Sequence, residues 1–170
     1  RNRKIGFVFQ SFNLISRTSA LKNVELPMTY ARVPKAKRVE RAHMLLERVG
    51  LGARQDHMPN ELSGGQRQAM ALLMSTMTPI EFLILDEHTA ALDPKTAELI
   101  MELTDQIVRE KKLTTIMVTH NLRYAVEYGN RLVMMHQGQV ILDKKEEEKQ
   151  QMTVDEILKL FNEISIECGN

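Results

Sequence analysis

The chain has 170 residues, of which 43% are hydrophobic and 26% are charged. This length and balance are typical of one globular domain and argue against a disordered or fibrous protein. A net charge of +1, from 23 basic and 22 acidic residues, leaves no overall field that would attract nucleic acid. No apolar run approaches the roughly 18 to 20 residues of a membrane-spanning helix, so we expect no direct membrane insertion. The single cysteine, Cys168, cannot form an internal disulfide, which favours a reducing, cytoplasmic compartment.

The first half of the chain is predicted to contain one strand followed by helices. A short apolar run at residues 5–9 predicts a buried strand. Helical spacing of apolar residues predicts a helix over residues 35–49. A turn-rich stretch at residues 59–65 then leads into a second helix over residues 66–77.

The middle of the chain continues this alternation of strands and helices. We expect a fully buried strand at residues 82–85, a helix at about 95–110 and another buried strand at 116–118. Strands that alternate with helices are typical of a largely parallel sheet. The sequence therefore predicts an α/β fold.

The C-terminal part carries weaker signals. We expect a short helix at residues 122–128 and a strand pair within residues 132–142. Residues 144–151 are interpreted as a solvated charge run. Thr153 and Glu156 have the spacing of a capping box, which predicts an amphipathic helix after them.

A glycine pair directly before a predicted helix is the sharpest local feature. Leu62 is followed by Ser63, Gly64, Gly65 and Gln66. Glycines let backbone N–H groups approach an anion closely, and a helix N-terminus favours negative charge. The pattern indicates a site that faces phosphate. Taken alone, it is also compatible with a glycine-containing helix cap.

Two adjacent carboxylates follow the next buried strand. Asp86 and Glu87 have the arrangement needed to coordinate magnesium and to orient an attacking water. As isolated residues they are equally compatible with solvated acids at a strand end. Asp93 lies in the loop beyond them, and His120 lies at the end of the next predicted strand.

These motifs, taken in order, resemble the nucleotide-binding domain of the ATP-binding-cassette (ABC) family. Gln10 matches the Q-loop, residues 62–66 the signature, Asp86 and Glu87 the Walker B motif with its catalytic acid, Asp93 the D-loop, and His120 the switch histidine. The resemblance extends over roughly residues 5–143. Residues 5–68 look like cassettes of lipoprotein-release and macrolide exporters, whereas residues 69–143 look like an importer-like subgroup.

The resemblance implies a P-loop NTPase-like fold with three layers around a parallel sheet and an ABC-type α-helical subdomain. Residues 1–143 would form a partial nucleotide-binding domain, with the helical subdomain at about 12–80 and a partial RecA-like core at 5–11 and 81–143. Residues 144–170 would form a charged linker and a C-terminal amphipathic helix.

No G-x-x-x-x-G-K-[ST] segment occurs in the chain. We therefore expect the P-loop strand and helix to be missing from the sheet and part of the sheet to be uncovered. Phosphoryl transfer depends on positioning and charge stabilisation, so this chain alone is expected to hydrolyse ATP poorly or not at all.

The resemblance also implies residue roles around ATP and Mg²⁺. Asp86 would hold Mg²⁺ through water, Glu87 would polarise the attacking water, and His120 would contact the γ-phosphate. Gln10 would sense Mg²⁺ and that water. Ser63, Gly64, Gly65 and Gln66 would face ATP held by an opposite protomer, with Asp93 at the dimer seam.

The partners implied are a second nucleotide-binding domain and an ABC transmembrane subunit, which would place the chain at the inner face of the cell membrane. Two alternatives remain open. One is a non-hydrolysing interaction module that completes a partner's ATP site, which the missing P-loop favours. The other is a soluble ABC ATPase of DNA repair or translation. It ranks last because the region between Gln10 and Ser63 has no long heptad insertion or strong basic patch.

Some neighbouring residues are assigned no chemical role. His88, where the family more often has proline, is interpreted as loop variation rather than a metal ligand. Arg67 and Gln68, just inside the helix after the signature, are left outside the site. The helical row of Met70, Met74 and Met77 is interpreted as core packing.

Overall fold

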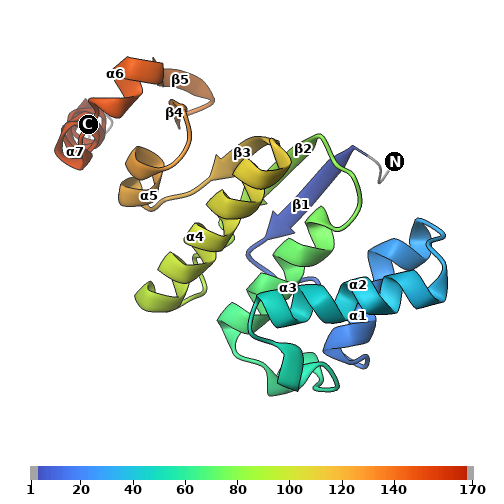
Figure 1. Cartoon of the computed structure of the whole chain (residues 1–170). Helices are drawn as coiled ribbons and strands as arrows, with labels where there is room; N and C mark the ends of the chain where they lie inside the picture. Colours follow the sequence, from blue (N-terminus) through green and yellow to red (C-terminus); the bar gives the residue numbers. More distant parts are fainter. Residues whose placement is uncertain (1–3, 168–170) are drawn as a thin grey trace. The chain divides into compact units, whose positions relative to one another are not determined.

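A computed structural model describes residues 4–167, with side-chain surroundings given for residues 4–162. Cys168 and the prediction about its compartment therefore lie outside the described residues. The chain divides into two compact units, Arg1–Val118 and Thr119–Asn170. Figure 1 labels the helices and strands of both units. The domain assignment with a boundary at residue 143 remains a prediction.

The first unit is built around a parallel three-stranded sheet in the order β1-β2-β3. Its elements along the chain are β1 (Ile5–Phe9), α1 (Ala20–Tyr30), α2 (Lys35–Arg48), 3-10 turns at Gly52–Arg54 and Pro59–Glu61, α3 (Gly64–Thr76), β2 (Phe82–Asp86), α4 (Pro94–Lys111) and β3 (Thr114–Val118). The predicted strands and helices of this unit are confirmed to within a few residues. The mixed architecture with a parallel sheet confirms the α/β fold class.

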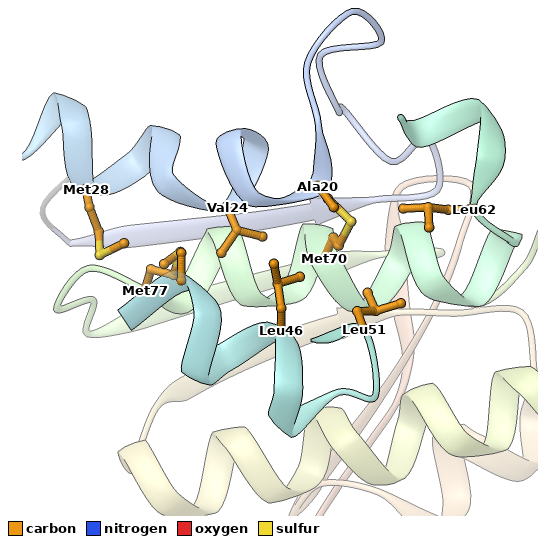
Figure 2. Packing of buried hydrophobic residues seen from close by; sticks show 9 residues of the cluster. Ala20, Val24, Met28, Leu46, Leu51, Leu62, Met70 and Met77 are labelled. Atoms are coloured by element: carbon orange, nitrogen blue, oxygen red, sulfur yellow. The ribbon is translucent and has the colours of Figure 1, made fainter. Parts of the chain in front are cut away.

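Helix α3 lies between two hydrophobic cores. On one side, Met70 and Met77 pack with residues of α1 and α2, a cluster that includes Val24 and Leu46 (Figure 2). On the other side, α3 faces the sheet and packs against a second cluster. The residues of that second cluster are Val8, Ala71, Leu72, Leu83, Leu85, Ile107 and Leu113. A helix that is apolar nearly all round fits such a position. The methionine row is confirmed as core packing, with Met74 packed at its edge.

Only one face of the sheet is covered within the first unit. Val8 of β1 is 1% exposed, whereas its neighbours Phe7 and Phe9 are 45% and 39% exposed. On β3, Ile116 and Val118 are 51% and 50% exposed. The prediction of fully buried strands was therefore wrong for this face, because α3 and α4 both pack against the other one. The exposed side chains on this face agree with the expectation that part of the sheet is uncovered.

The second unit contains an antiparallel hairpin and short helices. Its elements are α5 (Leu122–Glu127), β4 (Arg131–His136), β5 (Gln139–Lys145), α6 (Glu146–Gln150) and α7 (Val154–Glu167). Arg131 and Asp143 form a bidentate pair across the hairpin, at 2.7 and 2.8 Å. The predicted capping box before α7 is confirmed, because the Glu156 carboxylate accepts from the Thr153 N–H at 2.8 Å and the Thr153 hydroxyl accepts from the Glu156 N–H.

The charge run at residues 144–151 is not simply solvated, so that prediction was wrong. It contains the end of β5 and all of α6. Lys149 is only 2% exposed, and its ammonium group donates to the carbonyl oxygens of Val126 and Tyr128 at the end of α5. Burial lowers the pKa of Lys149. The two carbonyl acceptors offset the desolvation of the charged form, since the C-terminal end of a helix attracts cations.

Among residues 4–167, no helix combines the length and the apolar character required for crossing a membrane.

Candidate functional site

The predicted Q-loop and Walker B residues meet at the carboxyl edge of the sheet. In the strand register, Phe9 of β1 lies opposite Asp86 of β2, and Asp86 lies opposite Val118 of β3. Gln10 directly follows β1, and an open hollow is lined by Phe9, Gln10, Ser11 and Asp86. The Asp86 side chain is exposed there. Gln10 and Asp86 are thus neighbours, as the family resemblance implied, although they lie far apart in the sequence.

Glu87 begins a tight turn at the end of β2. Its N–H donates to the Val118 carbonyl at 3.0 Å, which ties the turn to β3. Its own carbonyl accepts from the Ala90 N–H at 3.0 Å. The φ angle of Glu87 is 49°, in the left-handed region that non-glycine residues adopt at a cost. A strained backbone persists only where the surrounding structure holds it in place. Such residues cluster at functional sites.

Asp93 ends this turn and caps helix α4. Its carboxylate accepts from the Thr96 N–H at 3.1 Å. Hydrogen bonds from the side chain and from the backbone N–H of Thr96 hold the pKa of Asp93 below its usual value. The carboxylate is therefore charged at the N-terminus of α4, where the helix dipole stabilises it. Helix capping is a structural role of Asp93 that the sequence analysis did not assign.

The signature residues form a reciprocal cap on α3. The Ser63 hydroxyl accepts from the Gln66 N–H at 3.3 Å, and the Gln66 side chain accepts from the Ser63 N–H at 3.0 Å. The helix-cap interpretation of this motif is thus observed. It does not compete with phosphate binding, because the N–H groups of Gly64 and Gly65 still lie in the first turn, where helices leave N–H groups without intrahelical partners.

The glycine at position 65 is required by packing. A Cβ atom built on Gly65 would lie 2.2 Å from Cγ2 of Thr96. The start of α3 is therefore pressed against the start of α4, within three residues of Asp93. The structure brings the signature and the D-loop residue together in the same unit.

His88 is a buried structural histidine. It is 3% exposed, and its Nε2 atom lies 3.3 Å from the hydroxyl of Thr104. The Thr104 hydroxyl donates to the Ile100 carbonyl at 2.7 Å, so we assign the Nε2 atom as the donor to Thr104. Burial lowers the pKa of His88 to about 4, which keeps the ring neutral. Within the described part of the chain, no group of three or more His, Cys, Asp or Glu residues is arranged to hold a metal.

His120 belongs to the second unit and is described within it alone. It lies just before Asn121, whose side chain accepts from the Tyr124 N–H at 3.3 Å and so caps α5. The His120 side chain is exposed.

Two residues left outside the predicted site contact the segment that contains Gln10. Gln68 is fully buried and donates to the Phe9 carbonyl at 3.3 Å. Arg67 lies over the Phe12 ring, with its Cζ atom 4.6 Å from the ring centroid. Helical spacing could have indicated Gln68, because positions 68, 72 and 75 share the stripe of α3 that faces the sheet.

A sequence profile described as "ABC transporter" matches residues 1–90. The chain belongs to the ABC transporter family. Among curated proteins, this cassette is similar to a tyrosine transport ATP-binding protein of Clostridioides difficile (strain R20291), with 55% identity over 119 residues. It is also similar to an uncharacterised ABC transporter ATP-binding protein of Thermotoga maritima, with 50% identity over 140 residues. The two alignments cover 69% and 82% of this chain. The second alignment therefore includes residues from both halves of the chain, which the sequence analysis compared with different cassettes.

The cassette spans 47% and 59% of the lengths of these two relatives. Among solved structures, it is similar to the dimeric post-hydrolysis state of the ATP-binding cassette MJ0796 bound to ADP and Pi. That comparison has a TM-score of 0.74 and 38% identity, and it covers 85% of this chain and 64% of the solved one. The likeness confirms the ABC cassette fold that the motif resemblance implied.

Proposed function

We propose that this cassette is part of an ATP-binding subunit that couples ATP binding and hydrolysis, in a head-to-tail dimer, to transport by a separate membrane subunit. The observation that carries the proposal is the meeting of Gln10, Asp86 and Glu87 at the carboxyl edge of the parallel sheet. Open α/β sheets bind ligands at that edge. The partner subunit would place the cassette at the inner face of the cell membrane.

The residues at the hollow fit a magnesium ion. Mg²⁺ prefers oxygen ligands and is usually bound by one or two carboxylates together with water and substrate phosphates. The exposed Asp86 carboxylate and the Gln10 side-chain amide lie at the same hollow, and both carry such oxygens. When bound, Mg²⁺ would neutralise charge on the ATP phosphates. Asp86 would hold it through water, and Gln10 would sense both the ion and the attacking water.

Glu87 is the proposed general base. Two hydrogen bonds hold its backbone: the Glu87 N–H donates to the Val118 carbonyl, and the Glu87 carbonyl accepts from the Ala90 N–H. Catalytic groups need such fixed positions, because phosphoryl transfer is accelerated chiefly by positioning and by charge stabilisation. Glu87 would orient a water and accept its proton, and His120 would contact the γ-phosphate.

The signature would act on a second protomer. Ser63, Gly64, Gly65 and Gln66 would present a hydroxyl and first-turn N–H groups to the γ-phosphate of ATP held by that protomer. Asp93 would lie at the seam, which its packing beside the signature supports. The similar solved cassette is a dimer bound to ADP and Pi.

The second candidate is a non-hydrolysing module that completes a partner's ATP site. The absence of a G-x-x-x-x-G-K-[ST] segment among these 170 residues favours it. We propose that hydrolysis needs such a phosphate cradle in addition to the residues of this chain.

Steady-state ATP hydrolysis by the chain, and by a form extended upstream with a P-loop, tests the proposal. We expect turnover only from the extended form, and Glu87→Gln should reduce it at least about 100-fold, the usual minimum contribution of general base catalysis. Glu81→Gln is the matched control. Glu81 precedes the same strand at its opposite end and pairs only with exposed Lys4, at 3.7 Å, among the ion pairs described for residues 4–162.

Three results would decide against parts of this proposal. Equal turnover in the extended form and its Glu87→Gln variant would remove Glu87 from the base role. Turnover by the unextended chain that depends on Glu87 would show that the cradle is unnecessary. An extended form that binds ATP without turnover would favour the non-hydrolysing module.

A further inference from the structure

The two residues that follow the signature reach both ends of the segment containing Gln10. Gln68 is on the sheet-facing side of α3 and donates to the Phe9 carbonyl, which is the peptide group directly before Gln10. Arg67, one position earlier, covers the ring of Phe12 at 4.6 Å. Gln10 and Ser11 therefore lie between two points of attachment to the same helix.

Burial of the Gln68 side chain costs free energy, which indicates a specific role for this residue. Its side chain is 0% exposed, and burying an amide is unfavourable unless it is hydrogen-bonded. Within residues 4–162, the amide nitrogen donates to Phe9 and the Oε1 atom has no protein partner. Among residues 4–162, the Phe9 carbonyl is thus the one hydrogen-bond partner of the Gln68 side chain. An apolar residue of the same length would fill the space without an unpaired acceptor.

Ser75, on the same helix, makes another side-chain hydrogen bond to β1 and can be compared with Gln68. Ser75 also donates to a carbonyl of β1, that of Phe7, at 2.6 Å. Its single hydroxyl hydrogen is shared with the Ala71 carbonyl, whose oxygen lies 2.9 Å away. Ser75 holds the middle of the strand at Phe7, which does not line the hollow, whereas Gln68 holds the strand's last peptide group.

We propose that Arg67 and Gln68 are positioning residues that hold the Gln10 segment in register with the signature at the start of α3. The proposal rests on the proposed function for the roles of Gln10 and the signature. Because Ser63 to Gln66 cap the same helix that carries Arg67 and Gln68, a displacement of the signature would shift Gln10 with it. Coupling of this kind needs a rigid element with contacts at both sites, and α3 supplies it.

The test uses nitrogen-15 relaxation of the 170-residue chain without nucleotide, so its result does not depend on ATP turnover. In the parent chain, the backbone order parameters of residues 10–14 should be near the value of a rigid backbone, about 0.85. Gln68→Met keeps the length of the side chain and removes the donor, and should lower them to below about 0.6. Arg67→Gln removes the cation over Phe12 and should loosen residues 11–14 alone.

Ser75→Ala is the control, because it breaks the other side-chain bond from α3 to β1. It should leave the order parameters of residues 10–14 unchanged. The proposal would be overturned by a parent segment that is already mobile, by unchanged order parameters in both test variants, or by an equal loss in Ser75→Ala. If Gln68→Met does not fold, Arg67→Gln alone decides between these outcomes. Failure of ATP hydrolysis would refute the proposed function and leave this result as it stands.

Discussion

Gly65 and Thr96 are packed so closely that a Cβ atom on the glycine would lie 2.2 Å from Cγ2 of the threonine. This contact joins the first turn of α3 to the first turn of α4, which Asp93 caps. A β-branched residue in a helix has few alternative rotamers, so Thr96 cannot easily turn aside.

Gly65→Ala should therefore destabilise the chain by about 1 to 3 kcal/mol, the usual cost of overpacking. Urea unfolding measures the change. Thr96→Ala in the same chain should restore most of the loss, because its remaining Cβ lies at 3.6 Å, ordinary contact distance. Gly64→Ala is the matched control. Its Cβ would lie 3.2 Å from the flexible end of Leu92, which can move. If the threonine substitution fails to rescue Gly65→Ala, packing is not the reason for the glycine.

His88 should make stability fall as the pH is lowered below neutrality. Its pKa is about 4 in the folded chain, against an ordinary value of 6.5 for histidine. Between these values the unfolded chain binds a proton that the folded chain does not, so the free energy of unfolding rises with pH. From pH 6.5 to pH 5 the loss should be about 2 kcal/mol.

His88→Gln places an amide donor near the position of Nε2 and does not titrate. Urea unfolding at pH 5, 6 and 7 should therefore give a flatter profile for this variant. The measurements do not go below pH 5, because four carboxyl groups also have lowered pKa values and their contributions to stability are lost only in more acidic solution. These groups are Asp93, Asp143, Glu110 and Glu156. Parallel profiles for the variant and the parent would contradict the assignment.

Lys149→Met should destabilise the second unit by about 1 to 3 kcal/mol, because the carbonyls of Val126 and Tyr128 lose a charged donor. Lys144→Met is the control on the same charge run. Lys144 makes a pair with Glu148 at 3.4 Å, and removing an i,i+4 pair of this kind should cost less than about 0.5 kcal/mol. The midpoints of thermal unfolding of the two variants distinguish these two effects. Equal effects would mean that the burial of Lys149 contributes nothing to stability.

The open sheet face should promote self-association. Ile116 is 51% exposed and lies opposite Ile84, which lies opposite Phe7. Ile116→Thr keeps a β-branched side chain and should reduce association in sedimentation experiments while changing stability by about 0.5 kcal/mol or less. Val8→Thr, at a position that is 1% exposed, buries a hydroxyl and should cost about 1 to 3 kcal/mol. Unchanged association in Ile116→Thr would mean that this face is not the contact surface.

Much of the first unit could be predicted from the sequence because its signals are local. Apolar periodicity indicated the helices, and short apolar runs indicated the strands. The adjacency of Gln10 and Asp86 was implied by the family resemblance, which gives both residues a role around Mg²⁺, and the shared carboxyl edge of parallel strands explains it. Whether a strand is covered on both faces depends on which helices pack there, so the alternation at Phe7, Val8 and Phe9 was not visible in the pattern.

The missed residues have long-range partners. Lys149 is buried because its acceptors lie 23 and 21 positions earlier in the chain, at the end of another helix. Gln68 is buried because its acceptor lies 59 positions earlier. A charge run and a polar residue inside a helix both look solvated until those partners are known. The capping role of Asp93, by contrast, is local and could have been predicted from the Asp-Pro pair at the start of α4.

Helix α3 takes part in both cores of the first unit, with Met70 and the C-cap residue Met77 in one and Ala71 and Leu72 in the other. Neither core is complete without it, so the helical layer and the sheet layer cannot melt independently. The first unit should unfold in a single cooperative transition, with no intermediate in which α1 and α2 have detached while the strands remain paired. Amide hydrogen exchange in α1 and in β2 should then share one opening free energy, that of the whole unit.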